Sequence, residues 1–135
     1  VMKIEVKKTY EVTNEDVVDI LSAFDCHNWC CTIDYNECDY AAARAKLGKD
    51  ACYEDVLAQI LFDGGKLTFV DSEDPESRYC LTLPMLRFGI KSAIEQECYS
   101  DYNWYEDGKL NTCQIDSAVA DVIVQLGLFG EVRFG

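Results

Sequence analysis

The sequence predicts an α+β fold in which a largely antiparallel sheet is backed by helices. Segments with strand periodicity and segments with helix periodicity follow one another in the order β-α-β-α-β-β-α-α-β, and two consecutive strands form a hairpin. The 135 residues are 49% hydrophobic, which is enough for one sizeable core, and no linker or internal repeat divides them. We therefore expect a single α+β domain over residues 2–135, with Met2 as the native start.

The chain opens with a predicted strand that is followed by a helix. Apolar residues alternate along residues 4–12, which is typical of a strand or of a long hairpin arm. Residues 13–16 resemble a capping box, in which Thr13 offers its hydroxyl to the amides of the first turn. Apolar residues then recur at helical spacing, at Val17, Ile20, Leu21 and Phe24. These signals predict a helix over residues 14–24.

The middle of the chain is predicted to hold a second strand, a helical region and a hairpin. Residues 29–35 are rich in aromatic and β-branched side chains, which favours a strand. A helical pattern begins at about Tyr40, loosens near Gly48, and runs again from residue 53 to the Gly64-Gly65 pair, which favours a left-handed stop. The next two apolar runs are separated by Ser, Asp and Pro, which predicts a hairpin of residues 67–70 and 79–82.

The last third is predicted to hold two helices and a short strand. Pro84 suits the first turn of a helix. The buried stripe of that helix is Leu86, Ile90, Ala93 and Ile94. Residues 99–108 form a polar loop rich in aromatic side chains. The last helix is expected to begin near Asp116 and to end at Gly130, before a closing strand over residues 131–135.

Composition limits the classes of partner. The chain has 25 acidic and 12 basic residues, which give a formal charge of −13. Non-specific affinity for DNA or RNA depends on Lys and Arg displacing counterions, so direct nucleic-acid binding is disfavoured. The acids are scattered, with local density at residues 71–76 and 101–107. This placement favours a solvated surface over mimicry of nucleic acid.

The N-terminal pattern and the length of the apolar runs predict the cellular compartment. Charged and apolar residues alternate along residues 3–8, which excludes the apolar stretch of a signal peptide. The longest apolar runs fall far short of the roughly 20 residues that cross a bilayer. We expect a cytoplasmic protein without a membrane partner. Its eight cysteines are accordingly expected to be reduced thiols, several of them small core residues.

The densest chemical cluster contains Cys26, His27, Cys30 and Cys38. These side chains could supply four ligands to zinc, but their spacing matches no usual zinc finger or ribbon, and ordinary thiols are favoured. A nucleophilic pair of His27 with a neighbouring thiol is disfavoured, because adjacent residues seldom reach the required geometry. No phosphate-binding or hydrolase motif is present, so the sequence predicts neither catalysis nor a cofactor.

A recognition surface is predicted from residues that the periodicity leaves outside the core. On the helix after Pro84, helical geometry turns Arg87 and Phe88 away from the apolar stripe. Asn103 and Trp104 lie in the polar loop, and Trp29 begins a strand after a polar turn. Aromatic planes with an occasional arginine can stack a base and hold a phosphate, and they also anchor protein interfaces. The candidate ligand-binding residues are Trp29, Arg87, Phe88, Asn103 and Trp104.

Several segments together resemble small uncharacterised proteins of phages and prophages in gut Firmicutes. They are the N-terminal alternating strand, residues 14–24, the Asn28-Trp29 turn, residues 61–67, Leu81-Thr82-Leu83 and residues 120–135. The most specific pieces are the Gly-Gly turn and the Leu-Phe-Gly-Glu-Val-Arg-Phe-Gly terminus. The likeness covers most of the chain.

The resemblance implies an accessory role against bacterial defence. Some phage proteins of this size sequester the cyclic ADP-ribose signal of the Thoeris system in pockets at a dimer interface, and others block CRISPR nucleases. No ligand-contacting residue of the first group maps onto this chain. Arginines that could hold a pyrophosphate are also scarce, because only Arg44, Arg78, Arg87 and Arg133 are present.

Three functional hypotheses follow. The first is a non-catalytic phage accessory protein that sequesters a nucleotide-derived immune signal in the host bacterial cytoplasm. The second is an acidic interaction protein that blocks a basic host or CRISPR-type nuclease. The third is a small metal-binding or redox protein that uses the Cys26–Cys38 cluster. We also expect a homodimer or higher assembly, joined through a strand edge or through the helix face around Phe88.

Overall fold

A three-stranded antiparallel sheet, ordered β1-β2-β3, organises the fold. The computed structural model describes residues 1–26 and 28–135. Its first elements are α1 (Asn14–Ala23), β1 (Cys30–Asp34), α2 (Glu37–Leu47), α3 (Tyr53–Phe62), β2 (Leu67–Asp71) and β3 (Arg78–Leu81). They are followed by α4 (Leu83–Glu95), η1 (Ser100–Tyr102), β4 (Tyr105–Glu106), β5 (Lys109–Leu110), η2 (Thr112–Gln114) and α5 (Ser117–Phe129).

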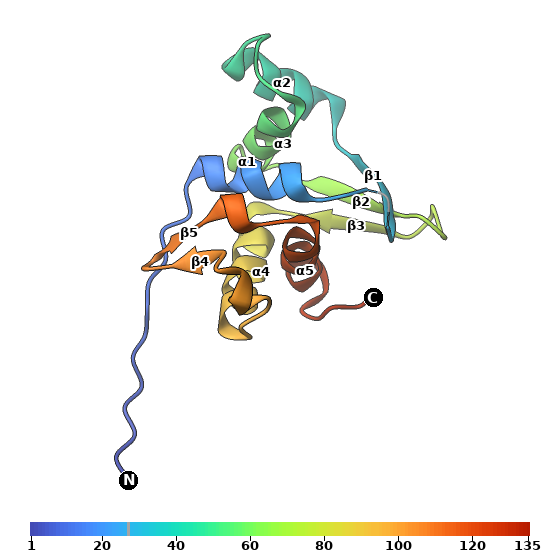
Figure 1. Ribbon diagram of the computed structural model, residues 1–135. Coiled ribbons are helices and arrows are strands. Elements are labelled where there is room, and N and C mark those ends of the chain that lie inside the picture. The colour runs from blue at the N-terminus through green and yellow to red at the C-terminus, as the bar shows by residue number, and fades with distance from the viewer. Residues whose placement is uncertain (27) are drawn as a thin grey trace.

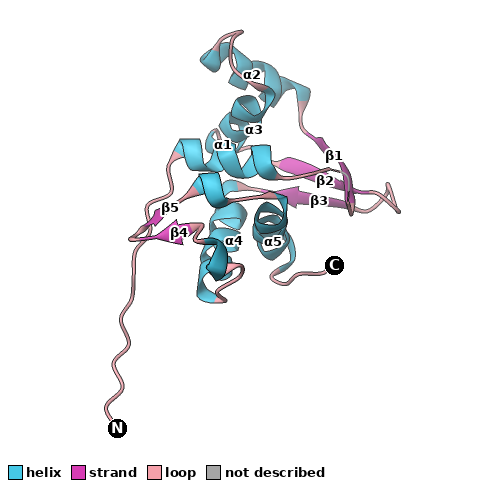
Figure 2. Cartoon of the chain, viewed as in Figure 1, coloured by secondary structure: helices cyan, strands magenta, loops and turns pink. Residues whose placement is uncertain are grey.

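The helices lie in two groups around α1 and the sheet. In Figure 1, α2 and α3 lie on one side and the α4–α5 pair lies on the other, while Figure 2 separates helices from strands by colour. The buried side chains form one core cluster shared by all five α-helices, β1, β2 and β3. The predicted α+β class, with antiparallel strands and helices around them, is confirmed.

Local signals account for most helix and hairpin positions. Thr13 Oγ1 accepts from the Asp16 N–H at 3.1 Å and Asp16 Oδ2 accepts from the Thr13 N–H at 2.9 Å, so the capping box is confirmed. Pro84 lies in the first turn of α4, and the left-handed Gly130 caps α5. The β2–β3 hairpin also forms where it was predicted. The second helical region begins at Glu37, earlier than expected, because Asn36 caps it.

The α4–α5 pair packs backbone against backbone. A Cβ atom at Gly89 would lie 2.2 Å from the Ile123 carbonyl oxygen, and one at Gly127 would lie 2.7 Å from the Met85 carbonyl oxygen. Such a close approach is open only to residues without a side chain. Gly89 and Gly127 therefore set the distance between the two helices.

The strand predicted over residues 4–12 is wrong. In this segment only Glu11 makes a bridge, parallel to Lys109, and its N–H donates to the Gly108 carbonyl oxygen at 2.7 Å. Tyr10 packs edge-on against Tyr105, and the first residues of the chain run away from the body (Figure 1). Alternation makes a segment suited to a strand, but a strand forms only where a partner edge accepts its backbone hydrogen bonds.

The closing strand predicted over residues 131–135 is wrong for a different reason. The buried Gln125 side chain accepts the N–H groups of Arg133 and Phe134, each at 2.8 Å, and donates to the Phe134 carbonyl oxygen at 3.1 Å. A side chain thus takes the backbone groups that a neighbouring strand would bind. The C-terminal residues return along α5 instead of extending the sheet.

The polar loop predicted over residues 99–108 is more ordered than expected, because it contains η1 and enters the short β4–β5 hairpin. Asp107 and Gly108 both have positive φ, 51° and 77°, as a two-residue hairpin turn requires. The Asp-Gly pair was the signal for this turn. No helix among the described residues combines the length and apolar character needed to cross a membrane.

Candidate functional site

The five predicted ligand-binding residues do not meet at one site. Trp104 is 0% exposed and its Nε1 donates to the Cys98 carbonyl oxygen at 2.8 Å, so the expectation that it lies outside the core is wrong. Asn103 is exposed and has left-handed backbone with φ 56°, and its N–H closes the η1 turn on Ser100 at 3.1 Å. Both residues shape the loop between α4 and β4.

Trp29 belongs to an aromatic cluster that holds the C-terminal segment. Its ring stacks on Phe134 with centroids 5.0 Å apart and an interplanar angle of 8°. Its Nε1 donates to Asp121 Oδ1 at 2.6 Å, and the other Asp121 oxygen accepts from Gln125 at 3.0 Å. Further rings around Trp29 belong to Phe24, Phe69, Tyr79 and Phe129. These partners already occupy the ring and the donor of Trp29, so its contacts are structural.

Arg87 and Phe88 are neighbours on α4 but face different surroundings. Arg87 is exposed and lines a groove, whereas Phe88, 49% exposed, is not among the lining residues. Successive residues of a helix point about 100° apart, which explains the separation. Among the five candidates, only Arg87 lies at this groove.

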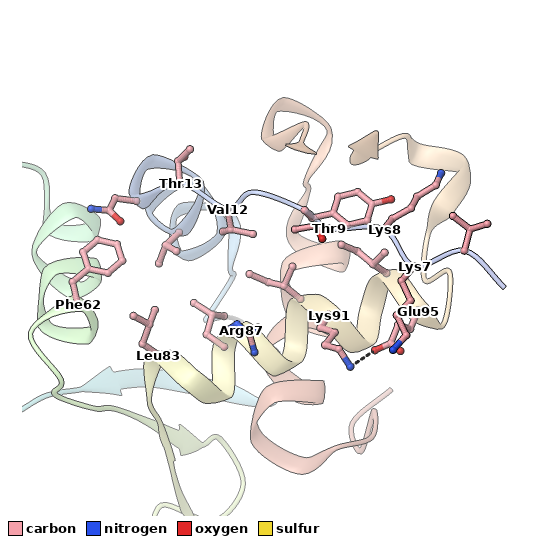
Figure 3. A pocket seen from close by; sticks show the side chains of 17 residues that line it. Lys7, Lys8, Thr9, Val12, Thr13, Phe62, Leu83, Arg87, Lys91 and Glu95 are labelled. Carbon is pink, nitrogen blue, oxygen red and sulfur yellow. Dashed lines mark ion pairs between the residues drawn. The ribbon is translucent and has the colours of Figure 1, made fainter. Parts of the chain in front are cut away.

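The groove runs between residues 6–14 and α4 and has a volume of about 1050 Å³ (Figure 3). Its floor is apolar. The floor side chains belong to α1 and α4, namely Val17, Leu83, Leu86, Ile90 and Ile94. Figure 3 shows Phe62 and Leu83 toward one end and Lys7, Lys8 and Glu95 toward the other, with Arg87 between them. The groove therefore has an apolar end and a charged end.

Basic residues are concentrated at the groove. Among the described residues, four of the twelve bases line it, but only one of the 25 acids does. Lys91 Nζ lies 2.9 Å from Glu95 Oε1 on the same helix, an exposed pair that adds little stability. Arg87 makes no hydrogen bond or ion pair with any described residue. In a chain of charge −13, the groove is a local site of positive charge.

Sequence reasoning missed most of this groove. Lys91 lies more than 80 residues after Lys7 and Lys8, and the three come together only because the N-terminal segment passes over α4. A usable signal existed, since Lys3, Lys7 and Lys8 gather at the start of a strongly acidic chain. It gave no information on which helix would lie beneath them.

The cysteine cluster is only partly described, because His27 lies outside the described residues. Cys26 is half-buried, Cys30 is buried, and Cys38 is exposed on the first turn of α2. Within the described part of the chain, no three His, Cys, Asp or Glu side chains are grouped to hold a metal ion. The Cys30 thiol donates to the Thr32 carbonyl oxygen at 3.3 Å, and it also interacts with the Cys26 thiol, which changes the pKa of both.

This pair predicts unequal thiol reactivity. The hydrogen bond from Cys30 lowers the pKa of Cys26 below its usual 9.0, although burial and nearby Asp25 act in the opposite direction. The same bond, together with burial, raises the pKa of Cys30. A lower pKa means more thiolate below pH 9, so Cys26 should be alkylated by iodoacetamide faster than Cys30 at every pH below that value.

The measurement is a pH series of alkylation rates, followed by peptide mass spectrometry. Cys30→Ala removes the donor and should shift the inflection of the Cys26 rate to higher pH. Equal rates for the two thiols, or an inflection that does not move in the variant, would contradict the pairing.

In comparisons with known proteins, no protein-family model, curated protein or solved structure matches the chain.

Proposed function

We propose that the protein is a non-catalytic binding protein that sequesters a nucleotide-like organic anion in the groove between residues 6–14 and α4. The main support is the guanidinium of Arg87, which is exposed on the groove wall and has no partner among the described residues. A guanidinium stays charged at all ordinary pH values and presents five N–H donors in a planar fork. It is thus suited to a phosphate or carboxylate.

The size and polarity of the groove support a small organic ligand. Small-molecule sites occupy roughly 300–1,000 Å³ and combine apolar walls with a few polar groups. The groove, at about 1050 Å³, lies just above this range and has that composition. Lys7 and Lys8 would neutralise a second phosphate at the charged end. Phe62 would offer a ring for a base at the apolar end.

The biological role in this proposal is that of a phage accessory protein that withholds a nucleotide-derived immune signal from its host. Sequestration requires tight, stoichiometric binding and no chemical step. An open groove with fixed positive charge supports such a role, and it needs no nucleophile, metal or cofactor. The proposed place of action is the host bacterial cytoplasm.

The proposal is tested by the melting temperature of the purified protein with a panel of anions. The panel contains ATP, ADP-ribose, cyclic ADP-ribose isomers, cyclic dinucleotides and palmitate, the last of which has a carboxylate but no base. A bound ligand at about 100 times its Kd stabilises the protein by about 2.7 kcal/mol, which raises the Tm by several degrees. At least one nucleotide should produce this shift.

Arg87→Ala should remove most of the shift while leaving the Tm of the free protein nearly unchanged, because Arg87 has no partner to lose. Arg78→Ala is the matched control, since Arg78 is an exposed arginine of β3 that pairs with Asp34 away from the groove. If palmitate alone raised the Tm, the proposal that the ligand is nucleotide-like would be rejected. A panel without any shift, or an equal shift in Arg87→Ala, would overturn the proposal.

The alternative of an acidic protein that blocks a basic partner has less support. In the acidic turn between β2 and β3, Asp71 Oδ1 accepts the N–H groups of Glu73 and Asp74 at 2.9 and 3.3 Å. Asp74 Oδ2 accepts from the Ser77 hydroxyl at 2.7 Å. These carboxylates shape their own turn, as Asp commonly does, so their density does not require a basic partner.

A further inference from the structure

The N-terminal arm, defined as residues 1–9, has no backbone hydrogen-bond partner among the described residues. All nine residues are exposed, and the relative exposure of Met2, Ile4 and Val6 is 87%, 77% and 77%. No backbone group of the arm hydrogen-bonds to a described residue, and the first such bond is the one from Glu11 to Gly108. Residues 6–9 of the arm also line the groove beside α4, while Figures 1 and 2 show the first residues of the chain running away from the body.

The arm carries the pattern of a strand with one apolar face. Met2, Ile4 and Val6 alternate with Lys3, Glu5 and Lys7. In extended backbone, successive side chains point to opposite sides, so the three apolar residues share one face and the three charged residues share the other. Unpaired N–H and C=O groups along such a segment form a template for another strand.

We propose that the arm pairs antiparallel with the arm of a second copy of this chain, in a register centred on Ile4. In this register Ile4 lies opposite its own copy, and Met2 lies opposite Val6 of the second copy. Lys3 lies opposite Glu5 of the second copy, and the two-fold symmetry repeats each pair. Directly opposed residues of opposite charge stabilise an antiparallel ladder, as do apolar pairs.

Neighbouring registers would form less favourable cross-strand pairs. Centring the pair on Glu5 would set Glu5 against itself and Lys3 against Lys7, so three like-charge pairs would form. Centring it on Val6 would place Ile4 opposite Lys8, and Met2 opposite Tyr10, which already packs on Tyr105. A slip by one residue would place apolar side chains opposite charged ones. The Ile4-centred register alone satisfies both faces.

Electrostatics favour the arm as the meeting point of two acidic bodies. Residues 1–8 contain three lysines and one glutamate, in a chain whose total charge is −13. The arm also holds the two bodies at opposite ends of the ribbon, because antiparallel strands leave in opposite directions. Since an isolated two-stranded ribbon is only marginally stable, the dimer should be weak and concentration-dependent. This inference does not depend on what the groove binds.

Sedimentation velocity from about 10 to about 500 µM measures the dimer and its dissociation constant. Lys3→Glu sets Glu against Glu5 in both pairs and should weaken the dimer roughly tenfold or more. Glu5→Lys should weaken it likewise, and the double variant Lys3→Glu/Glu5→Lys should restore it. In the Glu5-centred register, by contrast, Lys3→Glu would strengthen the dimer. The arm is exposed, so folding is unaffected in all three variants, which circular dichroism verifies.

Phe88→Ala is the control, because Phe88 is the half-exposed side chain that the sequence indicated as another interface. It should leave the dissociation constant unchanged. A wild-type protein that stays a 15.3 kDa monomer over the whole range would overturn the proposal. So would a dimer that is lost in Phe88→Ala, or one that the charge reversals neither weaken nor restore.

Discussion

Replacing Trp104 by alanine should lower the free energy of unfolding by about 3–5 kcal/mol, the usual cost of removing a large buried aromatic side chain. Trp104 is 0% exposed, and its ring lies 4.7 Å from that of Tyr105 at an interplanar angle of 78°. The substitution removes these contacts and leaves a cavity. It also deprives the Cys98 carbonyl oxygen of its donor. Guanidinium denaturation, with a fitted midpoint and slope, measures the change.

Tyr102→Ala is the matched control for Trp104. Both residues are aromatic and lie in the same loop, but Tyr102 is 38% exposed. Its substitution should change the free energy of unfolding by no more than about 1 kcal/mol, because exposed positions tolerate truncation. A similarly small effect for Trp104→Ala would show that Trp104 lies at the surface, and it would return Trp104 to the candidate ligand-binding residues.

Gly89→Ala should destabilise the protein by about 3 kcal/mol, at the upper end of the usual cost of overpacking. In an open helix the same change would stabilise by up to about 1 kcal/mol, since alanine is the better helix former. Here the new Cβ would lie 2.2 Å from the Ile123 carbonyl oxygen and 2.9 Å from the Gly127 nitrogen. Both are backbone atoms that cannot rotate away, so α4 and α5 must separate.

The sign of the Gly89→Ala effect is the decisive observable, because helix propensity and packing predict opposite directions. Thermal and guanidinium unfolding should both show the loss. Phe88→Ala, at the preceding position of α4, should have a much smaller effect because Phe88 is half-exposed. An alanine at Gly89 that stabilises the protein would mean that α4 and α5 do not touch there. The backbone packing described above would then be wrong.

Local interactions explain which elements could be predicted. The α1 helix and the β2–β3 hairpin depend on caps, turns and periodicities that lie within a few residues of one another. The same holds for the last helix, which was predicted to begin near Asp116 and to end at Gly130, and in which Asp116 is the N-cap residue. These signals act before any tertiary contact exists, so the sequence by itself determined these elements and the α+β class.

Of the residues that line the groove, only Arg87 was among the ligand-binding residues predicted from the sequence. Trp29 and Trp104 looked like surface aromatics, because residues around them are polar. Burial, however, depends on segments distant in the sequence, such as the C-terminal Phe134 that covers Trp29. The groove itself exists because the chain before α1 passes over α4.

The two ends of the chain show most clearly what only the tertiary structure decided. Both have alternating apolar residues, and the sequence by itself determined that both are suited to extended backbone. At the C-terminus, the buried Gln125 side chain takes the backbone groups and a strand does not form. At the N-terminus, only Glu11 finds an edge, at Lys109, and the residues before it pair with no described strand. Strand formation needs a hydrogen-bonding partner at a particular place, and that place is a property of the folded protein.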